Sequence, residues 1–413
     1  MNVKITPSKI FGEITAPPSK SYAHRLLIAA YLSGERVRVK NAGSSDDVSA
    51  TANALKSLGA NISIDDGAIT IERAEIPDKA TVDCRESGST LRFLLPVAAA
   101  LGIHSAFTGQ GRLLSRPISG LTGALNERGA KIDGLTVNGK LHHGEYRVPA
   151  NVSSQYITGL LFALPLLSGD SSVIFDGAPV STGYIDITLD VLNKFGISVE
   201  KTACGYNVKG DQKYKAPRDV TVEGDYSGAA FMLALGAMCG GVTVKGLNAT
   251  SLQGDAEIIN VLKNFGAKVT VQGDAVSMEK GELNAINIDC ENIPDLVQII
   301  SVVAAFCKGV TVLKNVSRLK LKESDRIAAI TSQLNSAGIR CDYECDSLFI
   351  HGGLPHGGIF SGGGDHRTVM SAVALSLGAK GESEVVGCEP VNKSYTEFFN
   401  DIIKLGGKVD VNV

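Results

Sequence analysis

The chain has 413 residues, of which 44% are apolar and 46 are glycine, a composition typical of a soluble α/β protein with many turns. A net charge of −3, with only 6% aromatic residues and no tryptophan, argues against a nucleic-acid groove. No apolar run reaches membrane-spanning length and the first residues lack a targeting pattern, so we expect a cytoplasmic protein without membrane contact. The eight cysteines are scattered through apolar segments, which fits a reducing compartment.

One eight-residue pattern recurs six times along the chain. Its first copy is Leu55-Lys-Ser-Leu-Gly-Ala-Asn-Ile62, and each copy resembles the end of a helix, a glycine stop and a strand. After the first copy, the pair Asp66-Gly67 predicts a hairpin to a second strand. The six glycines, 67 to 72 residues apart, are Gly59, Gly129, Gly196, Gly266, Gly338 and Gly406. Such a period indicates six copies of one supersecondary unit.

A second helix, with a polar first turn, belongs to each copy. A strand preceded by glycine, such as residues 241–245, lies between the two helices, so one unit is helix, strand, helix, strand, strand. Six units predict two domains of three, with the boundary within residues 217–223, and the first strand, residues 3–5, could pair with either half. The second helices are predicted to begin near Ser21, Ser89, Ser153, Tyr226, Pro294 and His366.

Polar and cationic residues gather where the helices of the first half begin. Residues 17–25, Pro-Pro-Ser-Lys-Ser-Tyr-Ala-His-Arg, open the first helix, and residues 86–90 open the next with small residues that let an anion approach backbone N–H groups. Arg116 precedes a proline, and residues 152–155 offer two hydroxyls and an amide that suit polyol or phosphate contacts. Each segment, taken singly, fits a helix cap or a surface charge equally well.

The second half contains the densest charge cluster, residues 318–326, Arg-Leu-Lys-Leu-Lys-Glu-Ser-Asp-Arg. It lies between a strand-like run and an apolar helical pattern, with Ser324 as the expected N-cap, and is a natural anion site. Asp295 opens a very apolar helix, where it could accept a proton from a substrate hydroxyl or simply offset the helix dipole. A glycine-rich turn precedes Arg367, and Lys393 lies in a strand-to-helix loop.

These cations recur at the same place in successive units, so they are not independent of one another. Collected at one cleft of a nearly neutral protein, they would focus a positive field suited to substrates with several anionic groups. The cations are Lys20, Arg25, Arg116, Lys322, Arg326, Arg367 and Lys393.

Two cysteines and two histidines lie close together in the sequence, at positions 341, 345, 351 and 356. The gap between the cysteine pair and the histidine pair is shorter than zinc-finger spacing. The alternation of Cys341, Tyr343 and Cys345 instead favours a hairpin with half-buried cysteines. No metal is therefore expected.

Seven motifs stand in the order found in one enzyme family. They are Pro-Ser-Lys-Ser-x-x-x-Arg (18–25), Ser-Arg-Pro-Ile (115–118), Ser-Ser-Gln (153–155), Tyr-Ile-Asp-Ile-Thr (184–188), Ile-Pro-Asp (293–295), Lys-Glu-Ser-Asp-Arg (322–326) and Asp-His-Arg (365–367). Through them the chain resembles the 5-enolpyruvylshikimate-3-phosphate synthases (3-phosphoshikimate 1-carboxyvinyltransferases) over essentially its full length. The resemblance implies an α/β fold of two domains, each of three βαβαββ units, the inverse α/β barrel of enolpyruvyl transferases. The implied domains are residues 19–222, and residues 1–18 with 223–413.

The resemblance also implies a reaction of the shikimate pathway and roles for single residues. The enolpyruvyl group of phosphoenolpyruvate moves to the 5-hydroxyl of shikimate 3-phosphate and phosphate leaves, without a cofactor, in a monomer that the herbicide glyphosate targets. The implied catalytic residues are Asp295 as base, Glu323 as proton shuttle, Lys20 and Lys393. Those implied for phosphoenolpyruvate are Lys20, Gly88, Arg116, Gln155, Arg326, Arg367 and Lys393. Those implied for shikimate 3-phosphate are Lys20, Ser21, Arg25, Ser153, Ser154, Gln155, Ser181, Tyr184, Asp295 and Lys322.

Two positions depart from the family pattern, and two alternative functions are less well supported by the sequence. Many relatives carry Asn at Arg318 and Pro at Phe93, the latter in the helix that presents Gly88. The sister family, UDP-N-acetylglucosamine enolpyruvyltransferase, is disfavoured by Arg25 and by the lack of a Cys near Arg116. A catalytically silent sensor of anionic metabolites is disfavoured because both expected proton-transfer carboxylates are present.

Overall fold

The computed structural model describes residues 1–412, which form two compact units. The first unit contains Met1–Ser19 and the chain from Glu223 onward, and the second contains Lys20–Val222. The chain therefore leaves the first unit at Ser19 and re-enters it at Glu223. No helix within residues 1–412 is long and apolar enough to cross a membrane.

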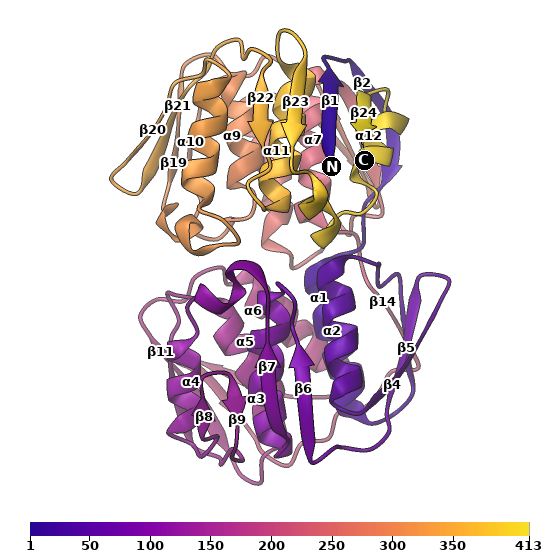
Figure 1. Ribbon diagram of the computed structural model, residues 1–413, viewed down its shortest axis with the longest axis vertical. Helices are drawn as coiled ribbons and strands as arrows, with labels where there is room; N and C mark the ends of the chain where they lie inside the picture. The colour runs from indigo at the N-terminus through magenta and orange to yellow at the C-terminus, as the bar shows by residue number, and fades with distance from the viewer. Residues whose placement is uncertain (413) are drawn as a thin grey trace. The chain divides into compact units, whose positions relative to one another are not determined.

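The second unit is built from three four-stranded sheets and the helices between their strands (Figure 1). The sheet orders are β14-β3-β5-β4, β6-β7-β9-β8 and β10-β11-β13-β12. The elements are α1 (Lys20–Ser33), β3 (Val37–Lys40), α2 (Asp46–Ser57), β4 (Ala60–Asp65), β5 (Ala68–Arg73), β6 (Lys79–Asp83), α3 (Gly88–Leu101), β7 (His104–Thr108), η1 (Gly111–Ser115), α4 (Ser119–Asn126), β8 (Ile132–Asp133), β9 (Thr136–Val137), β10 (Glu145–Pro149), α5 (Ser154–Ala163), η2 (Leu164–Leu166), β11 (Ser171–Asp176), α6 (Gly183–Lys194), β12 (Val199–Thr202), β13 (Gly205–Val208) and β14 (Asp219–Thr221).

The first unit repeats this plan with sheets ordered β16-β17-β15-β2, β18-β19-β21-β20 and β22-β23-β1-β24. The elements are β1 (Asn2–Thr6), β2 (Ile10–Thr15), α7 (Tyr226–Cys239), β15 (Gly240–Lys245), η3 (Gly254–Glu257), α8 (Ile258–Phe265), β16 (Lys268–Gln272), β17 (Ala275–Glu279), β18 (Asn287–Asp289), α9 (Val297–Ala305), β19 (Val310–Lys314), η4 (Ser317–Leu321), α10 (Arg326–Ser336), β20 (Cys341–Glu344), β21 (Ser347–His351), β22 (Ile359–Ser361), α11 (His366–Gly378), β23 (Ser383–Val386), η5 (Glu389–Lys393), α12 (Phe398–Lys404) and β24 (Lys408–Asn412).

All six sheets share one pairing pattern, a parallel pair followed by two antiparallel pairs. Each copy is therefore the same supersecondary unit, as the sequence repeat predicts. The N-terminal strand β1 pairs with β23 and β24, so it belongs to a sheet of the first unit. The hairpins predicted at Asp66-Gly67 and at Cys341–His351 are confirmed as β4–β5 and β20–β21.

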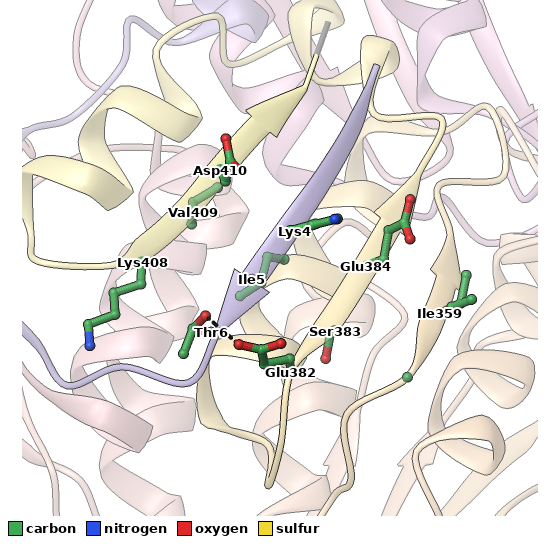
Figure 2. Close-up of a pocket in the computed structure, with 11 residues that line it drawn as sticks. Lys4, Ile5, Thr6, Ile359, Glu382, Ser383, Glu384, Lys408, Val409 and Asp410 are labelled. Carbon is green, nitrogen blue, oxygen red and sulfur yellow. Dashed lines mark hydrogen bonds between the residues drawn. The ribbon is translucent and has the colours of Figure 1, made fainter.

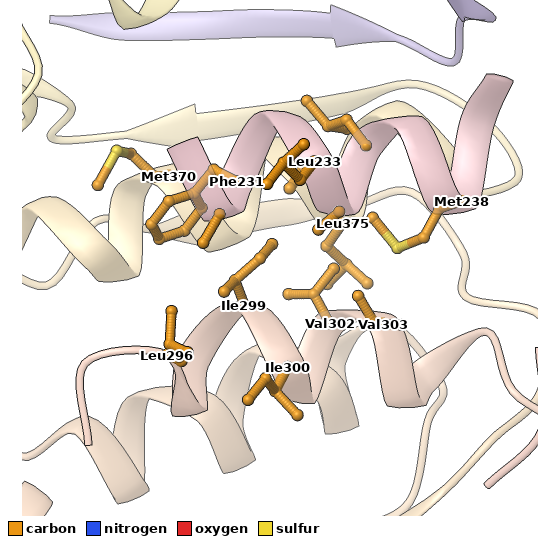
Figure 3. Packing of buried hydrophobic residues seen from close by; sticks show 14 of the residues in the cluster. Phe231, Leu233, Met238, Leu296, Ile299, Ile300, Val302, Val303, Met370 and Leu375 are labelled. Atoms are coloured by element: carbon orange, nitrogen blue, oxygen red, sulfur yellow. The ribbon is translucent and has the colours of Figure 1, made fainter. Parts of the chain in front are cut away.

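Three buried helices form the centre of each unit. In the first unit α7, α9 and α11 pack together, and Figure 3 shows Phe231 and Leu233 of α7, Ile299 of α9 and Leu375 of α11 in one apolar cluster. All but the last residue of α7 are buried, so this helix has no polar face. Such a helix can present polar groups only at its ends, and the sequence places the polar motifs at the starts of these helices.

The six repeat glycines all adopt the left-handed backbone conformation, with φ between +73° and +108°. A side chain with a Cβ disfavours that conformation, so glycine ends each helix and turns the chain into the next strand. This confirms the predicted glycine stops.

Two predicted helix starts need correction. The helix expected near Pro294 begins at Val297, because Ile293 and Leu296 form turns that leave Asp295 before the helix. The predicted N-cap Ser324 is also wrong, since the carboxylate of Asp325 accepts the amide of Ala328 and caps α10.

The glycine stop can be tested at Gly59, where an added Cβ would lie 2.0 Å from the carbonyl oxygen of Glu75. Gly67 is a matched control, because its φ of +70° is equally left-handed but no atom lies within 4 Å of an added Cβ. We expect Gly67→Ala to lower the free energy of unfolding by about 1 kcal/mol and Gly59→Ala by about 2 kcal/mol more. Urea unfolding of both variants, followed by circular dichroism, measures the difference. Equal losses would show that the Glu75 carbonyl moves aside freely.

Candidate active site

In the first unit, Arg326 joins three carboxylates at the start of α10. Its Nη1 donates to Asp295 Oδ1 at 2.9 Å, its Nη2 to Glu323 Oε2 at 2.8 Å and its Nε to Asp365 Oδ2 at 2.8 Å. The side chain is only 2% exposed, and burial by itself lowers the pKa of Arg326. The three carboxylates outweigh this effect and raise the pKa, so the guanidinium stays charged. The planar guanidinium thereby fixes the relative positions of the three acids.

Asp365 connects this guanidinium to the next helix. Its carboxylate is fully buried, accepts the amide of Arg367 at 2.9 Å as the N-cap of α11, and accepts the hydroxyl of Ser324 at 3.1 Å. Burial acts to raise the pKa of Asp365, but the adjacent Arg326 charge outweighs it and the pKa falls to about 2. The starts of α10 and α11 are thus held together by one ionised side chain.

Asp295 lies between β18 and α9 with three cations around its carboxylate. Oδ1 is 2.9 Å from Arg326 Nη1 and 3.3 Å from Lys322 Nζ, while Oδ2 is 3.2 Å from Arg367 Nη2. Arg367 also donates to the Asp295 carbonyl at 2.9 Å and to Ser227 Oγ at 2.6 Å. The Asp295 side chain is 18% exposed, so its carboxylate is partly accessible while these cations hold its orientation.

A second buried acid, Asp255 in η3, lies beneath this group. Burial raises its pKa to about 6, with the Asp295 charge acting in the same direction. The Asp225 charge also raises the pKa, whereas Arg367 and a hydrogen bond with Ser227 lower it. Asp255 therefore changes charge close to neutral pH in direct electrostatic contact with the candidate base.

In the second unit, Arg92 of α3 joins its own helix to the start of α5 and to the loop that contains Pro117. Its Nη1 donates to Gln155 Oε1 at 2.9 Å and its Nη2 to the carbonyl of Pro117 at 2.7 Å. The Gln155 amide in turn donates to Ser89 Oγ at 3.0 Å. The predicted site residue Gln155 is thus oriented by an arginine that the motif comparison did not include.

Gly88 is the first residue of α3, whose N-cap is Ser87. An added Cβ at Gly88 would lie 2.6 Å from Nη1 of Arg92 and 2.8 Å from Nη1 of Arg116. Glycine is therefore required for two guanidinium groups to reach this helix end, where backbone N–H groups already favour an anion.

Arg25 is held inside the second unit by neutral acceptors. Its Nε donates to Thr188 Oγ1 at 2.8 Å, its Nη1 to the Ser21 carbonyl at 2.8 Å, and its Nη2 to the Tyr184 carbonyl at 2.9 Å and Thr158 Oγ1 at 3.4 Å. Burial lowers the pKa of Arg25 to about 10, so it remains charged at neutral pH. Among the described residues, no carboxylate forms an ion pair with it.

The remaining predicted residues also lie at helix starts or in the loops beside them. Lys20 begins α1 and pairs with Asp47 of α2 at 2.8 Å, while Ser153 caps α5 by accepting the amide of Gln155 at 3.3 Å. Lys393 ends η5. Arg318, the departure from the family pattern, donates to the Glu291 carbonyl at 2.7 Å.

The predicted residues are divided between the two units. The first unit contains Asp295, Lys322, Glu323, Arg326, Arg367 and Lys393, and the second contains Lys20, Ser21, Arg25, Gly88, Arg116, Ser153, Ser154, Gln155, Ser181 and Tyr184. In the first unit the contacts described above join Asp295, Lys322, Glu323, Arg326 and Arg367 into one network. In the second unit they link Arg25 to Ser21 and Tyr184, and Arg92 to Gln155. Sequence reasoning missed Arg92, Asp255, Asp365 and Ser227. Asp365 is the first residue of the Asp-His-Arg motif (365–367), and an acidic residue at the start of a predicted helix could have indicated its role.

Residues of the β22-β23-β1-β24 sheet line a separate hollow in the first unit (Figure 2). It contains no predicted site residue, and its charges are Lys4, Lys408, Glu382, Glu384 and Asp410. Two cations against three carboxylates do not attract a polyanion, so the hollow is no alternative substrate site.

The fold is that of the enolpyruvyl transferases. The enolpyruvyl transferase NikO of Streptomyces tendae superposes with a TM-score of 0.80 at 15% identity, covering 99% of this chain and 98% of that chain. EPSP synthase of Acinetobacter baumannii superposes with a TM-score of 0.84 at 25% identity and covers all of both chains.

Sequence relatives identify the member of this fold class. Residues 5–402 match the model of EPSP synthase (3-phosphoshikimate 1-carboxyvinyltransferase). The 3-phosphoshikimate 1-carboxyvinyltransferase of Clostridium kluyveri is 41% identical over 99% of this chain and 98% of its own length, and that of Clostridium novyi is 38% identical over the same shares. The chain belongs to the EPSP synthase family.

Asp255 provides a test of the buried charge cluster. Because its folded pKa lies above its ordinary value, the folded state binds an extra proton between about pH 4 and pH 6, and stability falls as pH rises through this window. We expect Asp255→Asn to raise the free energy of unfolding by about 1–3 kcal/mol at about pH 8, with the gain vanishing near pH 4.

Urea unfolding of the parent and the variant across this pH range measures the effect. A constant difference between the two proteins at every pH would show that Asp255 does not titrate with a raised pKa.

Proposed function

We propose that this chain transfers the 1-carboxyvinyl group of phosphoenolpyruvate to the 5-hydroxyl of shikimate 3-phosphate and releases phosphate. Membership of the EPSP synthase family supports the reaction. The observation that carries the chemistry is the Arg326 network, which presents two partly exposed carboxylates, Asp295 and Glu323, beside cations. Addition followed by elimination needs this combination, because protons move while anionic groups are held in place.

The proposed steps move protons between the substrates and two carboxylates of the first unit. Asp295 accepts the proton of the 5-hydroxyl as its oxygen attacks the central carbon of phosphoenolpyruvate, and Glu323 delivers a proton to the methylene carbon. In the elimination Glu323 takes a proton back from that carbon, the bond to the phosphate oxygen breaks, and the departing phosphate takes up the proton held by Asp295. Lys393 and Lys20 assist these proton transfers and stabilise the developing negative charge.

Charged and polar residues of both units are proposed to bind the substrates. Phosphoenolpyruvate is assigned to Lys20, Gly88, Arg116, Gln155, Arg326, Arg367 and Lys393. Shikimate 3-phosphate is assigned to Lys20, Ser21, Arg25, Ser153, Ser154, Gln155, Ser181, Tyr184, Asp295 and Lys322. The buried charge of Arg25, with only neutral acceptors around it, supports an anionic group as its ligand.

The remaining parts of the proposal concern assembly and location. The enzyme acts as a monomer in the cytoplasm, needs no cofactor, and has no nucleic-acid or membrane partner. The two compact units, Lys20–Val222 and the rest of the described chain, are proposed to be its two domains.

The role of Asp295 is tested by Asp295→Asn, which keeps the size of the side chain and one acceptor oxygen but removes the base. We expect turnover to fall at least about a hundredfold, with both substrates still bound. Phosphate release in the steady state measures turnover, and calorimetric titration of shikimate 3-phosphate measures binding. Near-normal turnover would exclude Asp295 as the base, and no phosphate release by the parent protein would overturn the proposed function.

Gly88→Ala tests the assignment of phosphoenolpyruvate to the start of α3. The added methyl group must displace the guanidinium groups of Arg92 and Arg116, and it would intrude on the bulkier mimic glyphosate more than on the natural substrate. We expect inhibition by glyphosate to weaken at least about tenfold and the KM for phosphoenolpyruvate to rise by a smaller factor. Gly123→Ala in α4 is the control, because it adds the same methyl group to a helix at a position where no atom lies within 4 Å of an added Cβ. Equal losses for the inhibitor and for phosphoenolpyruvate would show that Gly88 does not face the additional atoms of the mimic.

A further inference from the structure

The buried guanidinium of Arg25 has one more contact, with the aromatic ring of Phe93. The guanidinium carbon lies 4.9 Å from the ring centroid, within the range of a cation–π interaction. Phe93 belongs to α3 and Arg25 to α1, so this contact joins two of the central helices of the second unit. Phe93 is 1% exposed and Arg25 is 2% exposed, which removes the screening that weakens such contacts at a surface.

The orientation of the Phe93 ring is fixed by its other neighbours. The His24 ring meets it in an edge-on arrangement at 6.5 Å, with an interplanar angle of 87°. The Phe162 ring lies 6.3 Å from it, tilted by 52°. His24 is held in turn by a 2.6 Å hydrogen bond between its Nδ1 and Thr51 Oγ1, and burial lowers its pKa to about 3, so it is neutral. The ring face is thus presented to Arg25 without a competing cation.

An aromatic ring differs from a carboxylate in how it holds a cation. A carboxylate at this position would neutralise Arg25 and would have to be displaced by an incoming anion. The ring quadrupole attracts the guanidinium but leaves its full charge in place. The neutral oxygens of Thr188 and of the Tyr184 carbonyl act in the same way.

We propose that Phe93 is a positioning residue for shikimate 3-phosphate, because its ring holds Arg25 in the orientation that binds this substrate while leaving the positive charge available. This inference rests on the proposed function, which assigns Arg25 to that substrate. It predicts that changes at Phe93 act on shikimate 3-phosphate and much less on phosphoenolpyruvate.

The first test compares Phe93→Leu with Phe162→Leu. Both remove an aromatic ring from the same buried cluster, but only Phe93 contacts Arg25. We expect Phe93→Leu to raise the Kd for shikimate 3-phosphate about tenfold or more, and Phe162→Leu to change it by less than about threefold. The KM for phosphoenolpyruvate should change by less than about threefold in both variants. Equal effects of the two variants on the Kd would reduce Phe93 to a core residue and overturn the inference.

A second measurement does not depend on how well a leucine variant folds. Phenylalanines with one, two and three ring fluorines are introduced at position 93. Each fluorine reduces the negative electrostatic potential of the ring face and nearly preserves the shape of the ring. We expect the Kd for shikimate 3-phosphate to rise stepwise along the series. A flat series would also overturn the inference.

Arg25→Gln separates this inference from the proposed function. Loss of shikimate 3-phosphate binding in Arg25→Gln, together with unchanged binding in the Phe93 variants, would reject the role of Phe93 alone. Retention of full affinity in Arg25→Gln would reject the assignment of Arg25 itself and, with it, the inference.

Discussion

The first unit depends on one buried cation. Arg326 satisfies three carboxylates that come from three separate places in the chain, before α9, before α10 and before α11. Removing a guanidinium from water costs several kcal/mol, which only close, well-oriented carboxylates can offset. The loss of any one acid would leave Arg326 less well compensated, so the three helix starts are constrained jointly. The geometry of the proposed catalytic carboxylates and the local stability therefore have the same physical origin.

The two units handle charge in opposite ways. In the first unit Lys322, Arg326 and Arg367 form ion pairs with Asp295, Glu323 and Asp365, and Asp255 adds a further acid beside them. In the second unit Arg25 is held by hydroxyls, carbonyls and a ring, none of which cancels its charge. A network of paired charges suits proton transfer, because a proton that moves within it meets compensating charges nearby. An uncancelled cation suits the retention of an anion.

The sequence predicts the architecture better than it predicts the contacts within the site. Each repeat glycine needs the left-handed conformation, so its spacing revealed the six units. The first residue of a helix is harder to predict where two residues that can cap it are adjacent. The sequence favours Ser324 as the N-cap of α10, whereas the structure has Asp325 in that position. The inner helices are buried all round, so their periodicity does not reveal which residue faces the site. For that reason the contact between Phe93 and Arg25 and the bonds of Arg92 required the structure.

The pairing of β1 has a consequence for the order in which the protein folds during synthesis. The second unit is one continuous stretch, Lys20–Val222, and all its strands have emerged before the remainder of the chain is made. The strand β1 lies between β23 and β24, with Asn2 opposite Asn412 (Figure 1). Strand β1 is therefore made long before its partners β23 and β24, and we expect the continuous second unit to fold while β1 is still unpaired. A rearranged chain in which β1 follows β24 through a short linker would place the paired strands next to each other in the order of synthesis.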